Sequence, residues 1–347
     1  MPSIEVGILG ATGMVGQQFI ALLAEHPWFK VSFLGASERS AGKAFKDAAA
    51  WRLPNLLPDD VAKRVVENAA PGNAPKLVFS GLDSSVAGEI EAEFAKAGHI
   101  VVSNSRNYRM VDTVPLLIPE VNADHLKLLA LQGEAQGWKG RIVTNPNCST
   151  VAITMALAPL RQFGIEKMMV TTLQAISGAG YPGVPSWDIL GNIIPYISGE
   201  EEKIETETKK ILGSLGQGRI DDHPVRVSAT TTRVLVRDGH SCSISVGLEQ
   251  KPSPEAMIDA WRSFRGRPQE LGLPTAPKQP VVYLEEANRP QPVLDAGREG
   301  GMAVSVGRLR RCSLFDYKFM ALGHNTIRGA AGVAILNAEL LHAEGLL

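Results

Sequence analysis

The sequence predicts an α/β fold in two domains, the first built on a parallel sheet and the second an α+β domain with a mainly antiparallel sheet. Three observations predict it. The chain begins with a short apolar strand, a glycine-rich turn and a helix with apolar residues at helical spacing. Further short apolar runs follow, each ending in a polar loop. From Lys167 onward, apolar and polar residues alternate along longer runs, as in strands with one buried face.

Composition bounds the number of domains and the classes of partner. A chain of 347 residues with 44% hydrophobic content exceeds what one α/β layer needs. We therefore expect two domains, residues 1–147 with 325–347 and residues 148–324. A net charge of −1 gives no basic surface for nucleic acid. No apolar run reaches about twenty residues and no secretory signal opens the chain, so we expect no membrane association and a cytoplasmic location.

The first strand and helix, residues 4–10 and 14–24, enclose the turn Gly10-Ala-Thr-Gly13-Met-Val-Gly16. Glycine permits a tight turn and lets the backbone approach a pyrophosphate, which the helix N-terminus then holds. The spacing differs from the usual Gly-x-Gly-x-x-Gly, so the position between strand and helix carries the prediction. We expect a Rossmann-like dinucleotide-binding domain, with cofactor contacts from Gly10, Thr12, Gly13, Met14, Val15 and Gly16.

The segment after the second strand, residues 30–35, indicates which dinucleotide is bound. An NAD site usually places an acidic residue near this strand end to accept from the ribose 2′-hydroxyl. Here the chain instead offers donors and positive charge suited to a 2′-phosphate, so NADP is the expected cofactor. The acidic Glu38 in the same segment leaves NAD as an alternative cofactor. The segment could also be a solvated basic loop that contacts no cofactor. The candidate contacts are Ser37, Arg39, Ser40 and Lys43.

Two further strands, residues 76–80 and 99–103, end in polar loops. Ligands bind at the carboxyl ends of strands in open parallel sheets, so Ser80 and Gly81 are expected to contact the cofactor. In the second loop, Arg106 and Arg109 are candidates for an anionic group of a substrate. Spacing alone does not choose between these two arginines.

The second domain is predicted from period-two alternation, which favours a mostly antiparallel sheet. Residues 200–213 form a charged helix between the strands, and we interpret its charges as a solvated face. An alanine-rich helix over residues 325–341 is long enough to fold back and close the first domain. The alternating runs are residues 168–176, 225–236, 241–248, 304–309 and 317–322.

Cys148 follows a short strand and the turn Asn145-Pro-Asn147, and it opens an apolar helix. Unpaired N–H groups and the helix dipole stabilise an anion there, so we expect an easily formed thiolate and a nucleophilic thiol. The plainer interpretation, a small buried apolar residue, is weakened by the polar turn before it. Cys242 and Cys312 lie in strand-like runs and are interpreted as sheet residues. No Cys-x-x-Cys pattern is present, so we expect neither a disulfide framework nor a metal site.

A nucleophilic cysteine needs a proton acceptor with a pKa near 7, which histidine supplies. Of the seven histidines, His223, His240 and His324 remain after those in helical or linking segments are set aside. His240 ranks first because it begins a strand after Gly239 and follows nearby arginines.

Taken together, these residues resemble the aspartate-semialdehyde dehydrogenase family, most closely its fungal and archaeal branch. The matching pieces lie in the family's order along nearly the whole chain. They are Gly10–Gly16, Tyr108-Arg109-Met110, Asn145-Pro-Asn-Cys148-Ser-Thr, Gln174-Ala-Ile-Ser177-Gly-Ala-Gly180, Glu200-Glu-Glu-Lys203, Arg233 seven residues before His240, and Gly323-His-Asn325.

The resemblance implies NADPH-dependent reduction of L-aspartyl 4-phosphate to L-aspartate 4-semialdehyde, on the route to lysine, methionine and threonine. It implies Cys148 as nucleophile, His240 as general acid/base and Gln174 as the residue that orients the acyl group. Arg233 would bind the substrate α-carboxylate and Glu200 the ammonium, although Glu201 and Glu202 leave that choice open. It implies further that Arg109, Lys203 and Asn147 bind phosphate, and that Ser177, Gly178 and Asn325 line the nicotinamide.

Two other functions stay open at this point. The first is another acyl-phosphate or thioester reductase of the same architecture, such as N-acetylglutamyl-phosphate reductase or malonyl-CoA reductase. A free substrate amine needs a carboxylate partner, which Glu200 supplies. The second is a non-catalytic NADP-sensing module, which would not require Cys148 and His240. The resemblance also implies a homodimer or homotetramer, with the second domain's sheet at the interface.

Overall fold

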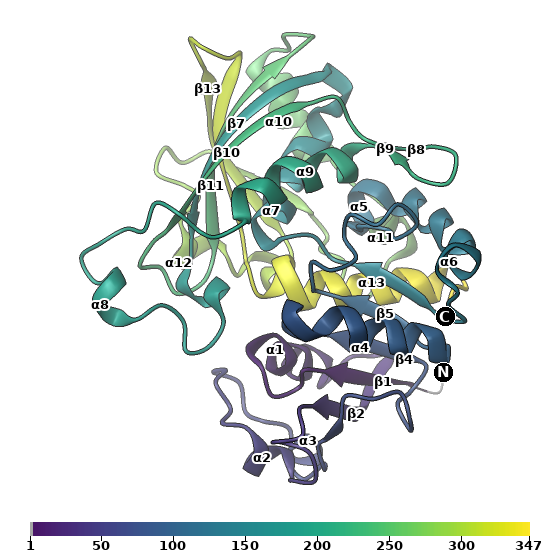
Figure 1. The fold of residues 1–347 in the computed structure, drawn as a ribbon. Helices are drawn as coiled ribbons and strands as arrows, with labels where there is room; N and C mark the ends of the chain where they lie inside the picture. Colours follow the sequence, from purple (N-terminus) through teal and green to yellow (C-terminus); the bar gives the residue numbers. More distant parts are fainter. Residues whose placement is uncertain (1–2) are drawn as a thin grey trace.

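The computed structural model describes residues 3–347, and Figure 1 shows its two sheets in separate halves of the molecule. The first sheet has six strands in the order β3-β2-β1-β4-β5-β6, all parallel, which confirms the predicted Rossmann-like domain. The strands are β1 (Ile4–Leu9), β2 (Phe29–Ala36), β3 (Glu67–Asn68), β4 (Leu77–Ser80), β5 (Ile100–Ser103) and β6 (Arg141–Thr144).

Helices cover the first sheet and connect its strands. The apolar strands are buried on both faces, because a parallel sheet is covered by its connecting helices. These elements are α1 (Met14–Leu23), α2 (Phe45–Ala48), α3 (Asp59–Ala62), α4 (Ser84–Ala97), α5 (Pro119–Asn122), the 3-10 helix η1 (Ala123–Leu128) and α6 (Leu129–Gln136). The C-terminal helix α13 (Gly332–Ala343) packs into the same core, and Figure 1 shows it in yellow beside β5.

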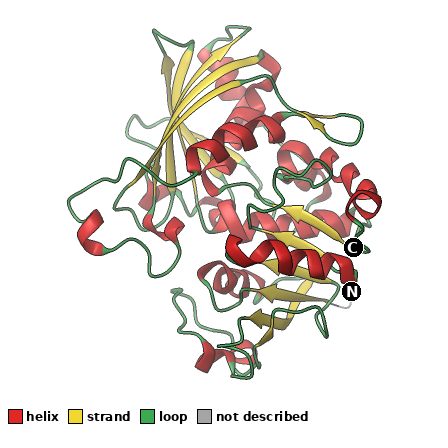
Figure 2. Cartoon of the chain, viewed as in Figure 1, coloured by secondary structure: helices red, strands yellow, loops and turns green. Residues whose placement is uncertain are grey.

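The second sheet is mixed, in the order β10-β7-β11-β14-β13-β12. Its inner pairs β7–β11, β11–β14 and β13–β14 are antiparallel, as predicted, whereas the outer pairs β7–β10 and β12–β13 are parallel. Figure 2 shows its strands as long twisted arrows. They are β7 (Ile165–Gln174), β10 (Arg226–Arg233), β11 (His240–Leu248), β12 (Val281–Leu284), β13 (Val304–Arg311) and β14 (Tyr317–Gly323).

Four helices of this half contribute to a separate apolar core on the second sheet: α7 (Cys148–Leu157), η2 (Ala158–Phe163), α9 (Glu200–Leu212) and α10 (Pro254–Ser263). The shorter helices of this part of the chain are η3 (Ile176–Ala179), α8 (Ser186–Ile189), α11 (Arg267–Leu271), α12 (Pro292–Asp295) and η4 (Arg298–Gly301), of which α11 contacts α5 and α13 of the first domain. A two-stranded sheet, β8 (Ser214–Leu215) and β9 (Ile220–Asp221), follows α9, and the π-helical turn η5 (Ile327–Ala331) precedes α13.

Cys242 lies buried in β11 as predicted, but Cys312 follows the end of β13 and is only partly buried. Cys312 therefore belongs to a turn, where its backbone N–H donates to the carbonyl of Asp316. Along residues 3–347, no helix is both long enough and apolar enough to span a membrane.

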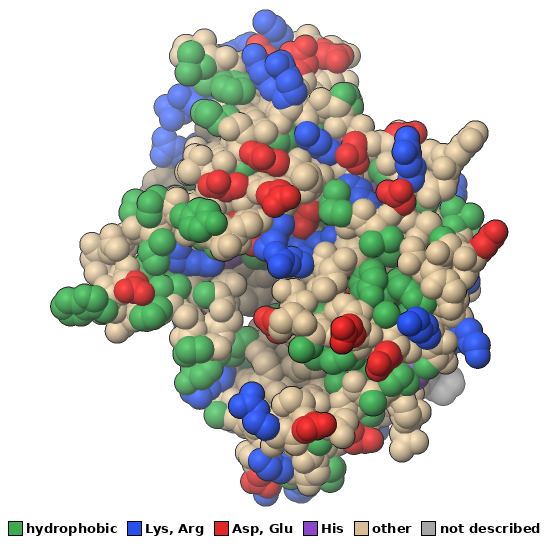
Figure 3. All heavy atoms as spheres, viewed as in Figure 1, with side chains coloured by type: hydrophobic (Ala, Val, Ile, Leu, Met, Phe, Trp, Pro, Cys, Tyr) green, Lys and Arg blue, Asp and Glu red, His purple; other side chains and the backbone are tan. Residues whose placement is uncertain are grey.

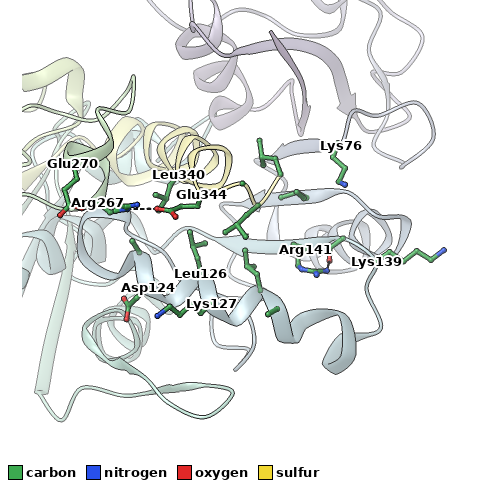
Figure 4. Close-up of a pocket in the computed structure, with 18 residues that line it drawn as sticks. Lys76, Asp124, Leu126, Lys127, Lys139, Arg141, Arg267, Glu270, Leu340 and Glu344 are labelled. Carbon is green, nitrogen blue, oxygen red and sulfur yellow. Dashed lines mark hydrogen bonds and ion pairs between the residues drawn. The ribbon is translucent and has the colours of Figure 1, made fainter. Parts of the chain in front are cut away.

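A cavity of about 870 Å³ lies where the amino ends of β5 and β6 meet η1, α11 and the C-terminal residues (Figure 4). Leu126 and Leu340 form part of its apolar wall. Among its charged lining residues, Lys139 extends away from the cavity and the Arg267 side chain is paired with Glu344. The cavity therefore lies at the opposite edge of the sheet from the carboxyl ends of the strands, where a dinucleotide domain binds its ligands.

Candidate active site

Sheet register brings three predicted site residues together at one end of the second sheet. Gln174 ends β7 and pairs with Arg233, which ends the parallel neighbour β10. His240 begins the antiparallel strand β11, next to the pair Ser241 and Leu173. The parallel strands β7 and β10 end at the same edge of the sheet, and the antiparallel strand β11 begins there. The side chains of all three residues therefore lie at this edge. The resemblance implied these residues from separate motifs, and the sheet explains why they meet.

Cys148 is the first residue of α7, and Asn147 is its N-cap. The Asn147 side-chain oxygen accepts from the N–H groups of Ser149 at 3.0 Å and Thr150 at 3.3 Å. This cap takes up two of the free N–H groups that open the helix and fixes its first turn. The predicted position of the thiol, after a short strand and a polar turn, is confirmed.

The expectation of an easily formed Cys148 thiolate is wrong for the structure. Cys148 keeps a partly exposed surface, yet the packing around its sulfur withdraws it from water and raises the pKa of the thiol to about 12. The Glu200 carboxylate contributes to this increase, and nearby arginine and lysine side chains only partly oppose it. Burial penalises the charged form more than the helix position favours it. At neutral pH, Cys148 is therefore a protonated thiol.

The π-helical turn η5 forms a close surface against the nucleophile helix. A Cβ atom at Gly329 would lie 2.7 Å from Cβ of Cys148, so only glycine fits there without a shift. The neighbouring Arg328 is fully buried and donates to both carboxylate oxygens of Glu120, at 2.8 and 2.7 Å. This bidentate ion pair fixes the turn beside Cys148.

Glu200 begins α9 and is the glutamate of its cluster that enters the site. Its carboxylate accepts from Lys203 Nζ at 2.7 Å and from Asn147 Nδ2 at 2.7 Å. Burial alone would raise the pKa of Glu200, but the Lys203 ammonium and the hydrogen bonds from Asn147 and Gln174 together hold the pKa below its usual value. Glu201 instead accepts from the backbone N–H of Thr231, and Glu202 is exposed. The geometry thus favours Glu200 over its two neighbours.

The charged helix α9 is not simply a solvated face, which corrects the prediction. Glu200, Glu207 and Lys210 are buried. The Lys210 ammonium donates to the carbonyls of Arg109, Val111 and Val114, and burial lowers its pKa to about 8. The helix therefore packs its charged side against the loop after β5.

Glu207 is the residue of the site that sequence reasoning missed. One of its carboxylate oxygens accepts from Arg109 Nη1 at 2.8 Å, and the other accepts from the backbone N–H of Asn147 at 2.6 Å. A signal existed in the sequence: Glu207 follows Glu200 by seven residues, two helical turns, so both lie on one face. Ile204 and Ile211 share that side of the helix and are buried, as expected of a face turned inward.

Of the two arginines left open by spacing, Arg109 is buried and Arg106 is exposed. Arg109 Nη2 donates to the backbone carbonyl of Asn104 at 2.7 Å, so Asn104 and Glu207 hold the guanidinium from two sides. The buried charge of Arg109 is not left unpaired, because the Glu207 carboxylate neutralises it. The structure therefore brings Arg109, and not Arg106, into the network around Cys148.

Gln174 and Arg233 face the start of α7. Gln174 Nε2 donates to Ser149 Oγ at 2.7 Å, beside the nucleophile. Arg233 Nη1 donates to the carbonyl of Ala175 at 2.7 Å, and no carboxylate lies within ion-pairing distance of Arg233 in the described chain. Burial lowers the pKa of Arg233. Its guanidinium thus has no carboxylate partner and is available to an anionic ligand.

His240 is fully buried, and its Nδ1 accepts from the backbone N–H of Ala175 at 3.0 Å. This bond fixes the tautomer, because an acceptor Nδ1 leaves any ring proton on Nε2. Burial, together with the positive charge of Arg233, lowers the pKa of His240 to about 3, so the ring is neutral at pH 7. A Cβ at Gly178 would lie 3.1 Å from His240 Nε2 and 3.0 Å from Arg233 Nη1. Gly178, His240 and Arg233 are therefore close neighbours in the site.

The other two candidate histidines lie elsewhere or act differently. His223 accepts from the backbone N–H of Val225, before β10 begins. His324 lies beside Asn325 and contributes to the low pKa of His240. Asn325 is buried: its Oδ1 accepts from the N–H of Gly239 and its Nδ2 donates to Ser177 Oγ, both at 2.8 Å. Asn325 thus ties the loop of Ser177 and Gly178 to the residue before His240.

The glycine turn after β1 fits a dinucleotide. Gly10 has φ of +75°, and a Cβ there would lie 2.8 Å from the carbonyl of Gly81. A Cβ at Gly16 would lie 2.3 Å from the carbonyl of Gly10, so larger residues are excluded at both positions. Gly13, the N-cap of α1, provides no side-chain cap, which leaves the helix N-terminus to a ligand. Thr12, Met14 and Val15 lie within the same turn and first helical residues.

The candidate 2′-phosphate residues lie directly after β2. Ser37, Arg39 and Lys43 are exposed and Ser40 is half-buried, in a turn closed by Lys43 Nζ donating to the carbonyl of Arg39 at 2.8 Å. Ser80 ends β4, and the Gly81 N–H donates to the carbonyl of Leu9, which aligns the two strand ends. All these candidates therefore meet at the carboxyl edge of the first sheet.

Lys and Arg side chains gather beside a hollow between the two halves of the molecule, with Asp and Glu side chains next to them (Figure 3). Within residues 3–347, no group of three or more His, Cys, Asp or Glu side chains could hold a metal ion.

Known proteins resemble this chain along nearly its whole length. Residues 5–129 match the semialdehyde dehydrogenase NAD binding domain, and residues 157–328 match the semialdehyde dehydrogenase dimerisation domain. The chain is 49% identical over 360 residues to an aspartate-semialdehyde dehydrogenase of Cryptococcus neoformans, covering 100% of this chain and 99% of that protein. It is 47% identical over 344 residues to one of Methanothermobacter thermautotrophicus, covering 98% and 99%. A crystal structure of aspartate-semialdehyde dehydrogenase with NADP from Candida albicans matches with a TM-score of 0.92, at 45% identity and with 99% and 100% coverage.

Proposed function

Because the chain belongs to the aspartate-semialdehyde dehydrogenase family, we propose that it performs the family reaction through a thioester on Cys148. The reaction is the NADPH-dependent reduction of L-aspartyl 4-phosphate to L-aspartate 4-semialdehyde with release of phosphate, in the biosynthesis of lysine, methionine and threonine. The observation that carries the thioester is the position of Cys148. It opens a helix among Gln174, Glu200 and Arg233, on elements that the fold brings together.

The substrate is held by charges of opposite sign on two elements. Arg233, whose guanidinium has no carboxylate partner, binds the α-carboxylate, and Glu200 binds the ammonium. Glu200 is ionised at neutral pH because Lys203, Asn147 and Gln174 together hold its pKa below the usual value despite burial. An N-acetylated amine or a CoA thioester would leave this carboxylate without an ammonium partner. The site therefore suits N-acetylglutamyl-phosphate reduction and malonyl-CoA reduction less well. Gln174 orients the acyl group beside Ser149.

Thioester formation requires the Cys148 thiol to lose its proton, and the pKa values of both Cys148 and His240 oppose transfer of that proton to the imidazole. The thiol has a pKa of about 12 and the imidazole of His240 about 3, so a free thiolate–imidazolium pair is strongly unfavourable. We therefore propose that proton transfer from Cys148 to His240 accompanies attack on the acyl carbon. The S–C bond forms as the C–O bond to phosphate breaks, and charge moves from sulfur to the leaving phosphate.

The departing phosphate is met by cations and by the first turn of α7. Arg109, Lys203 and the amide of Asn147 stabilise its charge. The N–H groups of Ser149 and Thr150 are occupied by Asn147 Oδ1, whereas the N–H of Cys148 has no acceptor in the described chain. The Cys148 N–H is therefore the donor for the tetrahedral oxyanion that would form later, when hydride adds to the carbon of the thioester.

NADPH, when bound, supplies the hydride that reduces the acyl carbon. Gly10, Thr12, Gly13, Met14, Val15 and Gly16 would hold its pyrophosphate side, with Ser80 and Gly81 at the next strand end. Ser37, Arg39, Ser40 and Lys43 would bind the 2′-phosphate, and Ser177, Gly178 and Asn325 would border the nicotinamide. After reduction the C–S bond breaks, and His240 returns its proton to the sulfur.

The match to a dimerisation domain supports an oligomer, and we propose a homodimer or a homotetramer. Met169 and Leu173 on β7 support the second sheet as the interface, because both apolar side chains are exposed on its open face. The domain boundaries at 147/148 and 324/325 and the cytoplasmic location stay predictions.

A substrate panel on the purified protein tests the function. Phosphate-dependent reduction of NADP is measured with aspartate semialdehyde, N-acetylglutamate semialdehyde and, with CoA in place of phosphate, malonate semialdehyde. The proposal expects turnover with aspartate semialdehyde and phosphate, and at most about one hundredth of that kcat/KM with the others. Preferred use of either other aldehyde would replace the proposed substrate, and bound cofactor without turnover would favour a sensing module.

A further inference from the structure

We propose that Glu207 is a positioning residue for phosphate, which holds the Arg109 guanidinium and the first turn of the nucleophile helix in fixed register. The inference rests on the proposed function, since it assumes that Arg109 and Asn147 meet the phosphate of the substrate. Glu207 itself touches neither the substrate nor the sulfur. It acts through Arg109 and through the backbone N–H of Asn147.

The geometry of Glu207 uses both of its oxygens. Arg109 Nη1 donates to Oε1 at 2.8 Å, and the N–H of Asn147 donates to Oε2 at 2.6 Å. A carboxylate is the side-chain group that accepts at two separate oxygens, and the charge strengthens both bonds. Glu207 is buried, so water does not substitute for either bond.

These bonds join three segments that are far apart in the chain. Arg109 belongs to the loop after β5 and is held on its other side by the carbonyl of Asn104. Asn147 caps α7, and Glu207 lies on α9, one helical turn before the lysine whose ammonium donates to the carbonyl of Arg109. Glu207 therefore connects an arginine of the first domain with the nucleophile helix.

The same network reaches the residues that hold the rest of the substrate. Asn147 Nδ2 donates to Glu200 at 2.7 Å, and Glu200 pairs with Lys203. With Nη1 and Nη2 anchored, the Nε atom of Arg109 has no partner in the described chain. An anchored guanidinium presents its remaining N–H groups in one orientation, which lowers the entropy lost when a phosphate binds.

A stabilising role alone would not require this arrangement. A buried ion pair is weak evidence for stability, because desolvation offsets much of the attraction between the charges. Two bonds from one carboxylate to two different functional segments instead give a defined geometry. The effect of Glu207 should therefore appear in phosphate kinetics more than in the binding of the other ligands.

The test compares Glu207→Gln with the wild-type enzyme in the direction that consumes phosphate. The amide of glutamine has one acceptor oxygen, so either Arg109 or the Asn147 N–H must face an NH₂ group and lose its bond. We expect the KM for phosphate to rise about tenfold or more and kcat to fall by a similar factor. The KM for aspartate semialdehyde and the Kd for NADPH should change by no more than about twofold.

Glu202→Gln is the matched control, because it removes the same charge from an exposed position of the same helix. It should leave both KM values, kcat and the melting temperature close to those of the wild type. Glu207→Asp keeps the charge but is shorter by one methylene, so it cannot bridge both donors and should show an intermediate rise in phosphate KM. It is measured in place of the glutamine variant if that variant does not fold.

Failure of the inference can be told from failure of the proposed function. If the wild type turns over aspartate semialdehyde with phosphate but the Glu207 variants keep its phosphate KM and kcat, the positioning role is wrong and the function stands. If the KM values for phosphate and aldehyde and the Kd for NADPH all rise together with a lower melting temperature, Glu207 is merely structural. A wild type without phosphate-dependent turnover would instead overturn the function.

Discussion

Gly329 packs directly against Cys148, because a Cβ atom at position 329 would lie 2.7 Å from Cβ and 2.9 Å from Cα of the cysteine. Gly329→Ala must therefore move the nucleophile helix or the π-helical turn. We expect kcat to fall about tenfold or more, because a shift of this size misplaces the sulfur, while overpacking costs about 1–3 kcal/mol of stability. Steady-state kinetics and urea denaturation measure the two effects.

Gly297→Ala is the control for this prediction, because a Cβ at Gly297 meets nothing within 4 Å. It should leave kcat within about twofold of the wild type. A fully active Gly329→Ala enzyme would show that the contact between η5 and α7 does not fix the nucleophile.

The pKa of Cys148 predicts how its reactivity depends on pH. With a pKa of about 12, the thiolate fraction increases about tenfold for each pH unit between pH 7 and pH 9. The rate of alkylation of Cys148 by iodoacetamide, in the enzyme without substrate, should follow that slope without a plateau. The measurement uses a Cys312→Ser background, because the backbone N–H of Phe315 lowers the pKa of the partly exposed Cys312. A plateau below pH 8 would instead restore the easily formed thiolate expected from the helix N-terminus.

Arg39 tests the choice of cofactor. Its side chain is exposed in the turn after β2, where a 2′-phosphate would lie. Arg39→Ala should raise the Kd for NADPH about tenfold or more, because a charge-assisted bond to phosphate is lost, and should change the Kd for NADH by less than about twofold. Fluorescence titration measures both. Equal weakening of the two cofactors would contradict the assignment of the 2′-phosphate site.

Glu91 on α4 predicts a pH-dependent stability. It is fully buried with Ser103 Oγ donating at 2.7 Å, and burial raises the pKa of its carboxyl from 4.5 to about 7. Because the folded pKa lies above the unfolded one, this contribution is fully present below pH 4.5 and is lost as the pH rises through 7. The loss amounts to up to about 3 kcal/mol.

Glu91→Gln lacks this titration. Its free energy of unfolding relative to the wild type should therefore increase by up to about 3 kcal/mol between pH 5 and pH 8, as measured by urea denaturation. A difference that stays constant across this range would show that Glu91 titrates near its ordinary pKa.

The strands, the glycine turn and the position of Cys148 were predictable because each depends on a short local pattern. An apolar run followed by glycines and a helical pattern is typical of a β–turn–α unit, and Asn147 caps α7 from the adjacent position. The motifs of Gln174, Arg233 and His240 were also recognisable, although only the register of β7, β10 and β11 shows that they share one edge.

The ionisation of the site could not be predicted in the same way. The pKa of Cys148 depends on burial and on Glu200, more than fifty residues away in the chain. Glu207 and Lys210 belong to a charged helix that, by composition alone, is typical of a solvated surface. Helical spacing places Glu207 on the same face as Glu200, but the burial of this charged face follows from packing against the loop of Arg109, which is a tertiary contact.

The central claim is that the acyl group is carried on the sulfur of Cys148, and mass spectrometry of the enzyme quenched in acid during turnover tests it most directly. With aspartate semialdehyde, NADP and limiting phosphate, we predict an aspartyl adduct on the peptide that contains Cys148 and none in Cys148→Ser. Normal turnover with an unmodified Cys148 peptide, or with the adduct on another residue, would contradict the account.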